Sequence, residues 1–138
     1  MPAGDSDTAR HILETARTIA VVGASPRPER PSHDVMAYLQ RHGYRCLPVN
    51  PGQAGRDLLG ETVSARLPDL PQAPDLVLVF RRAEETPPIA REAAESGATA
   101  LWLQQGIVNE EAAAIARAAG LAVVMDRCAK VDHSRFFA

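Results

Sequence analysis

Residues 18–27, which read TIAVVGASPR, decide the fold of this chain. Apolar residues run without interruption up to Gly23, and this pattern predicts a strand that is buried on both faces and ends in a tight turn. A glycine at that place lets the chain turn sharply and lets backbone approach a phosphate group. The turn lacks the three glycines of the dinucleotide fingerprint, so by itself it is only a weak indication of a nucleotide site.

The same apolar pattern recurs along the chain. Three of the runs begin directly after Gly43, Gly97 and Gly120, each of which reads as the residue that ends a preceding helix. The five predicted strands are at about 19–23, 45–50, 76–80, 100–104 and 121–126. Pro48 conflicts with a strand interior because proline cannot donate to a sheet ladder, so we expect it where its nitrogen needs no partner.

Helical patterns alternate with these strands. We expect helices at about 33–42, 87–96 and 109–119, a leading helix at about 8–16 within residues 1–17, and a tail at 131–138. Ser32, Thr86 and Asn109 are the expected N-caps of the first three. Residues 52–74 are the least regular part and have room for a short helix or an extra strand.

The alternation predicts βαβ units with right-handed crossovers. The chain is therefore predicted to be a single α/β domain, residues 1–138, folded as a three-layer Rossmann-like sandwich. A five-stranded parallel sheet lies at its centre, with helices on both faces. A flavodoxin-like arrangement with another strand order stays open.

Length, charge and cysteine content exclude several classes of protein. The 138 residues suffice for one apolar core, and a net charge of −2 disfavours binding to nucleic acid or to an anionic membrane. Cys46 and Cys128 match no metal-ligand spacing and favour a reducing compartment. The cysteine spacing therefore predicts no metal site. Because we find neither a signal peptide nor an apolar run long enough to span a bilayer, we expect a cytoplasmic protein.

One edge of the sheet is predicted to be basic although the whole chain is acidic. Ligands of such sheets bind beyond the carboxyl ends of the strands, near the point where the strand order reverses. Six of the 15 basic residues follow predicted strand ends: Arg27, Arg30, Arg81, Arg82, Arg127 and Lys130. Arginine forks and helix N-termini both suit phosphate, so we predict a small anionic ligand that carries phosphate. NAD is disfavoured because Asn50 stands where an acid usually holds the ribose hydroxyls.

Five stretches, taken in order, carry a resemblance to a known family. They are IAVVGASPRPERPSHDVMAYL (19–39), GYRCLPVNP (43–51), DLVLVFRR (75–82), ALWLQQGIVNEEAAAIARAAG (100–120) and VVMDRC (123–128). Together they resemble the small stand-alone coenzyme A (CoA)-binding proteins of bacteria, which are themselves similar to the N-terminal domain of the succinyl-CoA ligase α subunit. The resemblance implies a Rossmann-type domain that holds CoA, free or acylated, without an established reaction. We do not expect ligase activity, because 138 residues leave no room for the further domain that carries the phosphorylated histidine of the ligases.

The resemblance also implies roles for the residues at the strand ends. The turn Gly23-Ala24-Ser25 would receive the pyrophosphate, with Ser25 donating through its hydroxyl or its backbone. Phosphate charge would be neutralised by Arg27 and Arg30. The other implied contacts are Asn50 and Pro51 on the adenosine side, Phe80 and Arg81 along the crevice, and Gln104 and Gly106 beside the pantetheine path. No catalytic residue is predicted.

Two alternatives to a non-catalytic CoA-binding protein stay open. One is an enzyme that uses NAD(P) or an acyl-CoA, and the other is a subunit whose site is completed by a protein partner or by a second copy of the chain. Cys128 stands next to Arg127, where a cation could lower the pKa of a thiol. We interpret it first as a packing residue, and next as a nucleophile or a redox partner of the CoA thiol. His133 and Ser134 form no triad, since adjacent residues rarely align for proton transfer.

Overall fold

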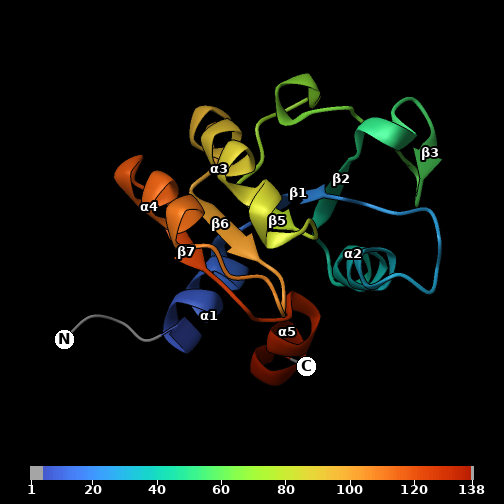
Figure 1. Cartoon of the computed structure of the whole chain (residues 1–138). Helices are drawn as coiled ribbons and strands as arrows, with labels where there is room; N and C mark the ends of the chain where they lie inside the picture. Colours follow the sequence, from blue (N-terminus) through green and yellow to red (C-terminus); the bar gives the residue numbers. More distant parts are fainter. Residues whose placement is uncertain (1–4, 138) are drawn as a thin grey trace.

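A computed structural model describes residues 5–137 of the chain and has five parallel strands at its centre (Figure 1). The strands are β1 (Thr18–Val22), β2 (Arg45–Val49), β5 (Leu76–Val79), β6 (Ala100–Leu103) and β7 (Ala122–Val124). The prediction of a three-layer α/β sandwich around a five-stranded parallel sheet is confirmed.

The sequence left the strand order open, and the structure has it as β2-β1-β5-β6-β7. In chain order these are the second, first, third, fourth and fifth strands of the sheet, which is the order of flavodoxin-like sheets. From β1 the chain crosses to one side, to β2, and it later returns to the other side of β1, to β5. The order therefore reverses between β1 and β5, and a ligand site is expected at their carboxyl ends.

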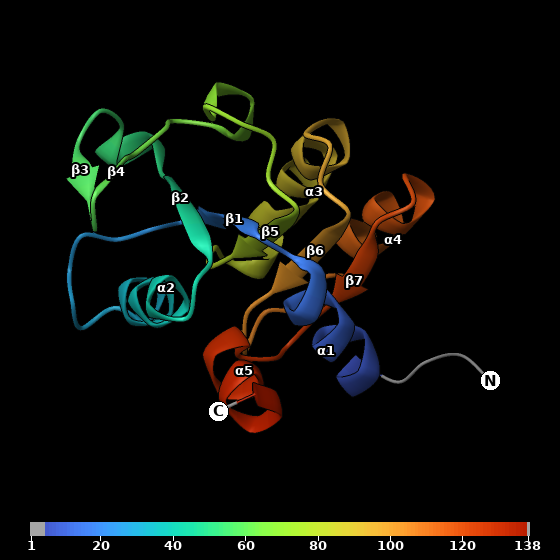
Figure 2. The same ribbon diagram turned by 180° about the vertical axis from the view of Figure 1, so that it is seen from behind.

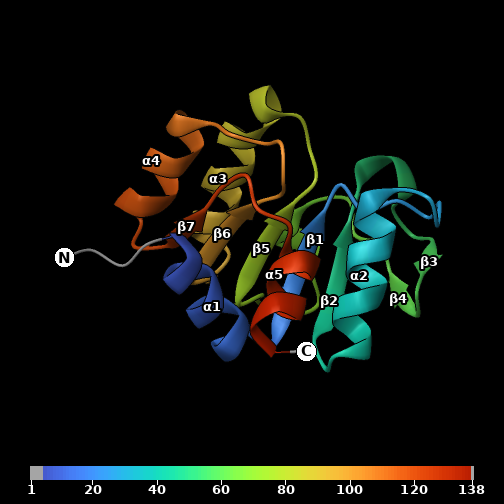
Figure 3. The same cartoon turned by 90° about the horizontal axis from the view of Figure 1, so that it is seen from below.

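Helices cover both faces of the sheet. On one face lie α1 (Asp5–Thr15), α2 (Pro31–Arg41) and α5 (Ala129–Phe137), and on the other lie α3 (Thr86–Glu95) and α4 (Glu110–Ala118) (Figures 1 and 3). Alternate residues of β1 enter two separate cores: Ile19 and Val21 pack toward the first set of helices, and Ala20 and Val22 toward the second. Both faces being covered explains why the strands read as continuous apolar runs.

Alanine builds the layer formed by α3 and α4, which lie side by side (Figures 1 and 2). The fully buried apolar residues of these helices are Ala90 and Ala93 in α3, and Ala112, Ala113 and Ala116 in α4. A methyl group is the smallest apolar side chain, so the helix backbones can lie close to the sheet and to one another.

The three expected N-caps have different outcomes. Asn109 is confirmed, because its side chain accepts a hydrogen bond from the Ala112 N–H at 2.9 Å. The prediction for Thr86 is wrong, because Thr86 is the first residue of α3 and the N-cap is Glu85. The prediction for Ser32 is wrong as well: α2 begins at Pro31, two residues before the expected start, and its N-cap is Arg30. The fixed φ of proline suits the first helical position, which explains the earlier start.

The C-terminal segment is helical and does not form the expected tail. Up to Phe137, residues from 131 onward belong to α5, while Ala138 lies outside the described residues. The buried face of α5 includes Asp132 and His133, which pair with Arg127 at 2.6 Å and with the Tyr38 hydroxyl at 2.9 Å. Because this buried face is polar, the segment has no apolar period that would reveal a helix.

The irregular residues 52–74 contain two short 3-10 helices and a small hairpin, and they border the edge strand β2. The two 3-10 helices are η1 (Pro51–Gln53) and η2 (Leu67–Asp69), and the hairpin between them consists of β3 (Asp57–Leu58) and β4 (Glu61–Thr62). Pro48 lies in β2, and its carbonyl accepts the Ser64 N–H at 3.0 Å on the side away from β1. Its nitrogen points to that same outer side, so Pro48 removes no bond from the sheet, as expected.

Among the helices described for residues 5–137, we find none with the length and apolar character needed to cross a membrane.

An aromatic cluster surrounds His133 at the amino ends of β1 and β2. The centre of its ring lies 5.4 Å from that of Tyr38, 4.8 Å from that of His42 and 5.7 Å from that of Tyr44. Burial lowers the pKa of His133, and the nearby His42 lowers it further. The folded protein therefore favours uncharged His133 at neutral pH.

We expect the free energy of unfolding to fall as the pH drops below about 6.5, where unfolded histidine takes up a proton that folded His133 resists. The loss continues until the pH has passed the lowered pKa of the folded state. Urea denaturation at about pH 7.5 and at about pH 5.5 measures it, with the buried Trp102 as the fluorescence probe. His133→Asn should reduce the difference between the two pH values, whereas His11→Asn, at an exposed position, should leave it unchanged. An unaltered pH dependence in His133→Asn would contradict this assignment.

Candidate ligand-binding site

Gly23, at the carboxyl end of β1, is the centre of the candidate site. Its φ is +88°, and its N–H donates to the Val49 carbonyl at 2.8 Å. A Cβ atom at this position would lie 2.9 Å from the Phe80 carbonyl oxygen and 3.0 Å from Cδ of Arg81. Only glycine therefore allows the turn after β1 to lie against the end of β5.

The turn that follows is held by the start of α2. The Ser25 N–H donates to the Ser32 hydroxyl at 3.1 Å, and the Ser25 hydroxyl accepts the Arg27 N–H at 3.2 Å. From the sequence, the hydroxyl and the backbone N–H of Ser25 are both possible donors to the ligand, and the backbone N–H is already used within the fold. The hydroxyl proton is the one left to donate.

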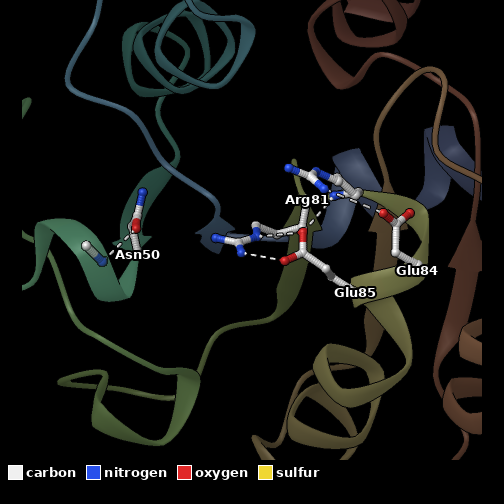
Figure 4. A network of polar contacts seen from close by, with 6 residues as sticks. Asn50, Arg81, Glu84 and Glu85 are labelled. Carbon is white, nitrogen blue, oxygen red and sulfur yellow. Dashed lines mark hydrogen bonds and ion pairs between the residues drawn. The ribbon is translucent and has the colours of Figure 1, made fainter.

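Asn50 ties the turn after β1 to the turn after β2. Its Nδ2 donates to the Ala24 carbonyl at 2.8 Å, and its Oδ1 accepts the Gly52 N–H at 2.9 Å (Figure 4). Both ends of the side-chain amide are used within the fold. Asn50 therefore positions the two loops, and its carboxamide has one donor hydrogen left over.

A groove runs along the carboxyl edge of the sheet on both sides of Gly23. A cavity of about 420 Å³ opens on the α2 side, and six predicted residues line it: Gly23, Ser25, Arg27, Arg30, Phe80 and Gln104. It continues into a hollow of about 480 Å³, because Pro31, Gln104 and Gln105 line both. Cys128 lines this second hollow.

The part of the groove on the α3 side has one apolar hollow and one polar hollow. A hollow of about 330 Å³ is lined by Val22, Val49, Pro51, Leu67 and Ile89, among others. A neighbouring hollow of about 290 Å³ is lined by Gly23, Asn50, Phe80, Arg81, Arg82 and Glu85. Gly23 belongs to both of these and to the cavity on the α2 side, so it stands where the two parts of the groove meet.

Two predicted site residues lie elsewhere. The Ala24 side chain is only 1% exposed and packs in the core, so only its backbone belongs to the turn. Gly106 lies outside the groove, and its N–H donates to Oδ1 of Asp126 at 2.7 Å. That bond joins the loops that follow β6 and β7.

Sequence reasoning missed Gln53, which lines the cavity on the α2 side. Its Oε1 atom is buried without a hydrogen-bond partner among the described residues. Gln53 lies in η1, a single 3-10 turn within a segment without apolar periodicity, so no pattern pointed to it. A buried acceptor beside a cavity is a candidate to bind a donor group of a ligand.

Carboxylates neutralise most of the predicted basic edge. Two of the ion pairs are those of Arg81 with Glu85 at 2.8 Å and of Arg82 with Glu84 at 3.9 Å (Figure 4). The other two are those of Arg127 with Asp132 at 2.6 Å and of Lys130 with Asp34 at 2.8 Å. Arg27 and Arg30 are exposed, and neither forms an ion pair with a carboxylate of residues 5–137. The cationic charge open to an anionic ligand is therefore concentrated at these two arginines.

The two cysteines lie in different surroundings. Cys46 is buried in the core, and burial raises the pKa of its thiol to about 12. Cys128 is only half-buried and lies directly before α5, where its carbonyl accepts the Asp132 N–H at 2.9 Å. Of the two thiols, that of Cys128 is the one next to the groove.

Comparison with known proteins identifies the family. Residues 17–134 match the model of the CoA binding domain family. The chain belongs to the CoA-binding domain family. The predicted resemblance is thereby confirmed, and the match spans all five strands and the loops that form the groove.

Three relatives of this CoA-binding domain extend over nearly all of the chain. The uncharacterized protein YneT of Bacillus subtilis (strain 168) is 42% identical over 125 residues, which are 91% of each protein. The structure of cell-free ID.343 from Thermus thermophilus is 41% identical with a TM-score of 0.91, and the match covers 98% of this chain and 100% of that one. A hypothetical protein from Pyrococcus horikoshii OT3 is 36% identical with a TM-score of 0.90, and the match covers 99% of this chain and 94% of that one.

Replacing Gly23 with alanine should destabilise this CoA-binding domain by more than the cost of placing an alanine at a positive φ. Gly55 is the matched control, because its φ is also +88° but a Cβ there would have nothing within 4 Å. We expect Gly55→Ala to lower the free energy of unfolding by about 1 kcal/mol and Gly23→Ala to lower it by at least about 2 kcal/mol. Urea denaturation of both variants measures the two values. Equal losses would show that the contact with Phe80 imposes no constraint.

Proposed function

We propose that this protein is a non-catalytic CoA-binding protein that holds its ligand along the carboxyl edge of the sheet, across Gly23. The observation that carries this proposal is the position of Arg27 and Arg30. These two arginines line the cavity beside the glycine turn, and no described carboxylate neutralises them. Membership of the CoA-binding domain family supports CoA as the ligand.

The shape of the groove supports a ligand with phosphates at its middle. CoA is elongated, with adenosine at one end, a pantetheine arm with a thiol at the other, and a pyrophosphate between them. A ligand that crosses Gly23 at its pyrophosphate would extend into both parts of the groove. Its phosphate oxygens would accept hydrogen bonds from the Ser25 hydroxyl and from the guanidinium groups of Arg27 and Arg30.

The two parts of the groove suit the two ends of such a ligand. The apolar hollow formed by Val49, Pro51 and Ile89 suits the flat face of adenine. The hollow on the other side, beyond Gln104, leads to Cys128 and suits the pantetheine arm. In this arrangement Asn50 holds the loops on the adenosine side, and the unpaired Oε1 of Gln53 is an acceptor for a donor group of the ligand.

The proposal of a non-catalytic role is supported by the acidic groups around the groove. Asp34 pairs with Lys130, and Glu85 pairs with Arg81. The hydrogen bond from Arg81 lowers the pKa of Glu85, so this carboxyl group is a poor proton donor at neutral pH. The free thiols of Cys46 and Cys128 further support a reducing compartment such as the cytoplasm.

Replacing Arg27 or Arg30 with alanine should weaken CoA binding by roughly tenfold to a hundredfold each, since a hydrogen bond to a charged group contributes about 1.5–3 kcal/mol. Isothermal titration calorimetry measures the affinities. Arg117→Ala is the matched control, because Arg117 is an exposed arginine in α4 without a described ion pair. If both site variants bind CoA as tightly as the unaltered protein, these arginines are not the phosphate anchor.

Titrations with CoA, acetyl-CoA, NAD and NADP in parallel should rank CoA or its acyl derivative first. Mass spectrometry of the small molecules that co-purify with the protein gives an independent answer. Tighter binding of NAD or NADP would overturn the proposal in favour of a nicotinamide-dependent protein. Turnover of acetyl-CoA would overturn its non-catalytic part.

A further inference from the structure

The groove contains an anion of its own, the carboxylate of Glu85. Its Oε1 accepts from Nη2 of Arg81 at 2.8 Å, and its Oε2 accepts from Nε of Arg81 at 3.4 Å (Figure 4). The Arg82 N–H donates to the same Oε2 at 3.3 Å. A guanidinium fork together with a backbone N–H is also a donor set that suits two oxygens of a phosphate group.

This donor set lies at the centre of the groove. Cδ of Arg81 is the side-chain atom that would lie 3.0 Å from a Cβ at position 23, so Arg81 packs across the glycine turn. Both Arg81 and Glu85 line the two hollows on the α3 side of that turn. Arg81 is therefore next to the proposed pyrophosphate position, but its guanidinium is already paired.

The pair can be exchanged because it is not deeply buried. The Arg81 side chain is 34% exposed and that of Glu85 is 40% exposed. Ion pairs at such positions contribute little to stability. The hydrogen bond from Arg81 lowers the pKa of Glu85, so the carboxylate is ionised at neutral pH and carries a full charge into the groove.

We propose that the Glu85 carboxylate competes with a phosphate group of the ligand for the guanidinium of Arg81. Ligand binding then requires Arg81 to exchange Glu85 for a phosphate oxygen, while Arg27 and Arg30 bind without such an exchange. This inference rests on the proposed function and adds a selective element to it. A ligand without an anionic group cannot take the place of Glu85 on Arg81.

Glu85→Gln removes the competing charge and keeps the shape of the side chain. We expect it to raise the affinity for CoA by about threefold to tenfold, because Arg81 is released and a negative charge leaves the groove. Inorganic pyrophosphate, as a second probe, should show a gain of similar size. Calorimetry on the full chain measures both, and thermal unfolding checks that each variant is folded.

Two further variants separate this exchange from a general effect of charge. Arg81→Ala should weaken binding, and adding Glu85→Gln to Arg81→Ala should change the affinity by less than twofold. Glu14→Gln is the matched control, because Arg10 and Glu14 form an exposed pair with the same four-residue spacing on α1, outside the groove. It should leave the affinity unchanged.

The outcomes distinguish this inference from the proposed function. If the unaltered protein binds CoA and Glu85→Gln binds it equally or more weakly, Glu85 orients Arg81 and the competition is refuted while the proposed function stands. If CoA does not bind but pyrophosphate binds Glu85→Gln more tightly, the proposed function fails and the competition stands. If neither probe binds either protein, both proposals are overturned. A full gain in the Arg81→Ala background would also overturn the competition.

Discussion

The ends of β1, β2 and β5 meet at one residue that has no side chain. Gly23 donates its N–H to Val49, the last residue of β2, while its α-carbon faces the Phe80 carbonyl that follows β5. From this meeting point the chain leaves β1 toward one face of the sheet and leaves β5 toward the other. The groove opens between the two departing loops, so its position and its two-sided shape both follow from the contact at Gly23.

The sheet could be predicted because every strand is buried on both faces and is bounded by turn residues. The strands, and the helices that pack against them through apolar residues, have recognisable apolar patterns. Their predicted bounds differ from those in the structure by only a few residues. α5 gave no such pattern, because its buried face makes polar contacts through Asp132 and His133. Ser32 looked like a cap because serine is common there, but Pro31 starts the helix and frees the Ser32 hydroxyl to bind Ser25.

The position of the candidate site could be predicted from the sequence, but the ion pairing of its basic residues could not. Residues that follow parallel strands gather at one edge, so nine of the eleven predicted residues line the groove. Counting cations could not show which of them are neutralised, because an ion pair such as that of Lys130 with Asp34 joins residues 96 positions apart. Gln53 stayed hidden for a related reason: its place beside the cavity depends on the path of an irregular loop.

The edge strand β2 has a feature that limits how this protein can associate with itself. At the outer side of β2 the nitrogen of Pro48 has no hydrogen to donate, and the Pro48 carbonyl already accepts the Ser64 N–H. The opposite edge strand, β7, has only three residues. Neither border offers the long row of free donors and acceptors that strand-by-strand polymerisation needs. Extension of the sheet across two molecules is therefore disfavoured at both of its edges.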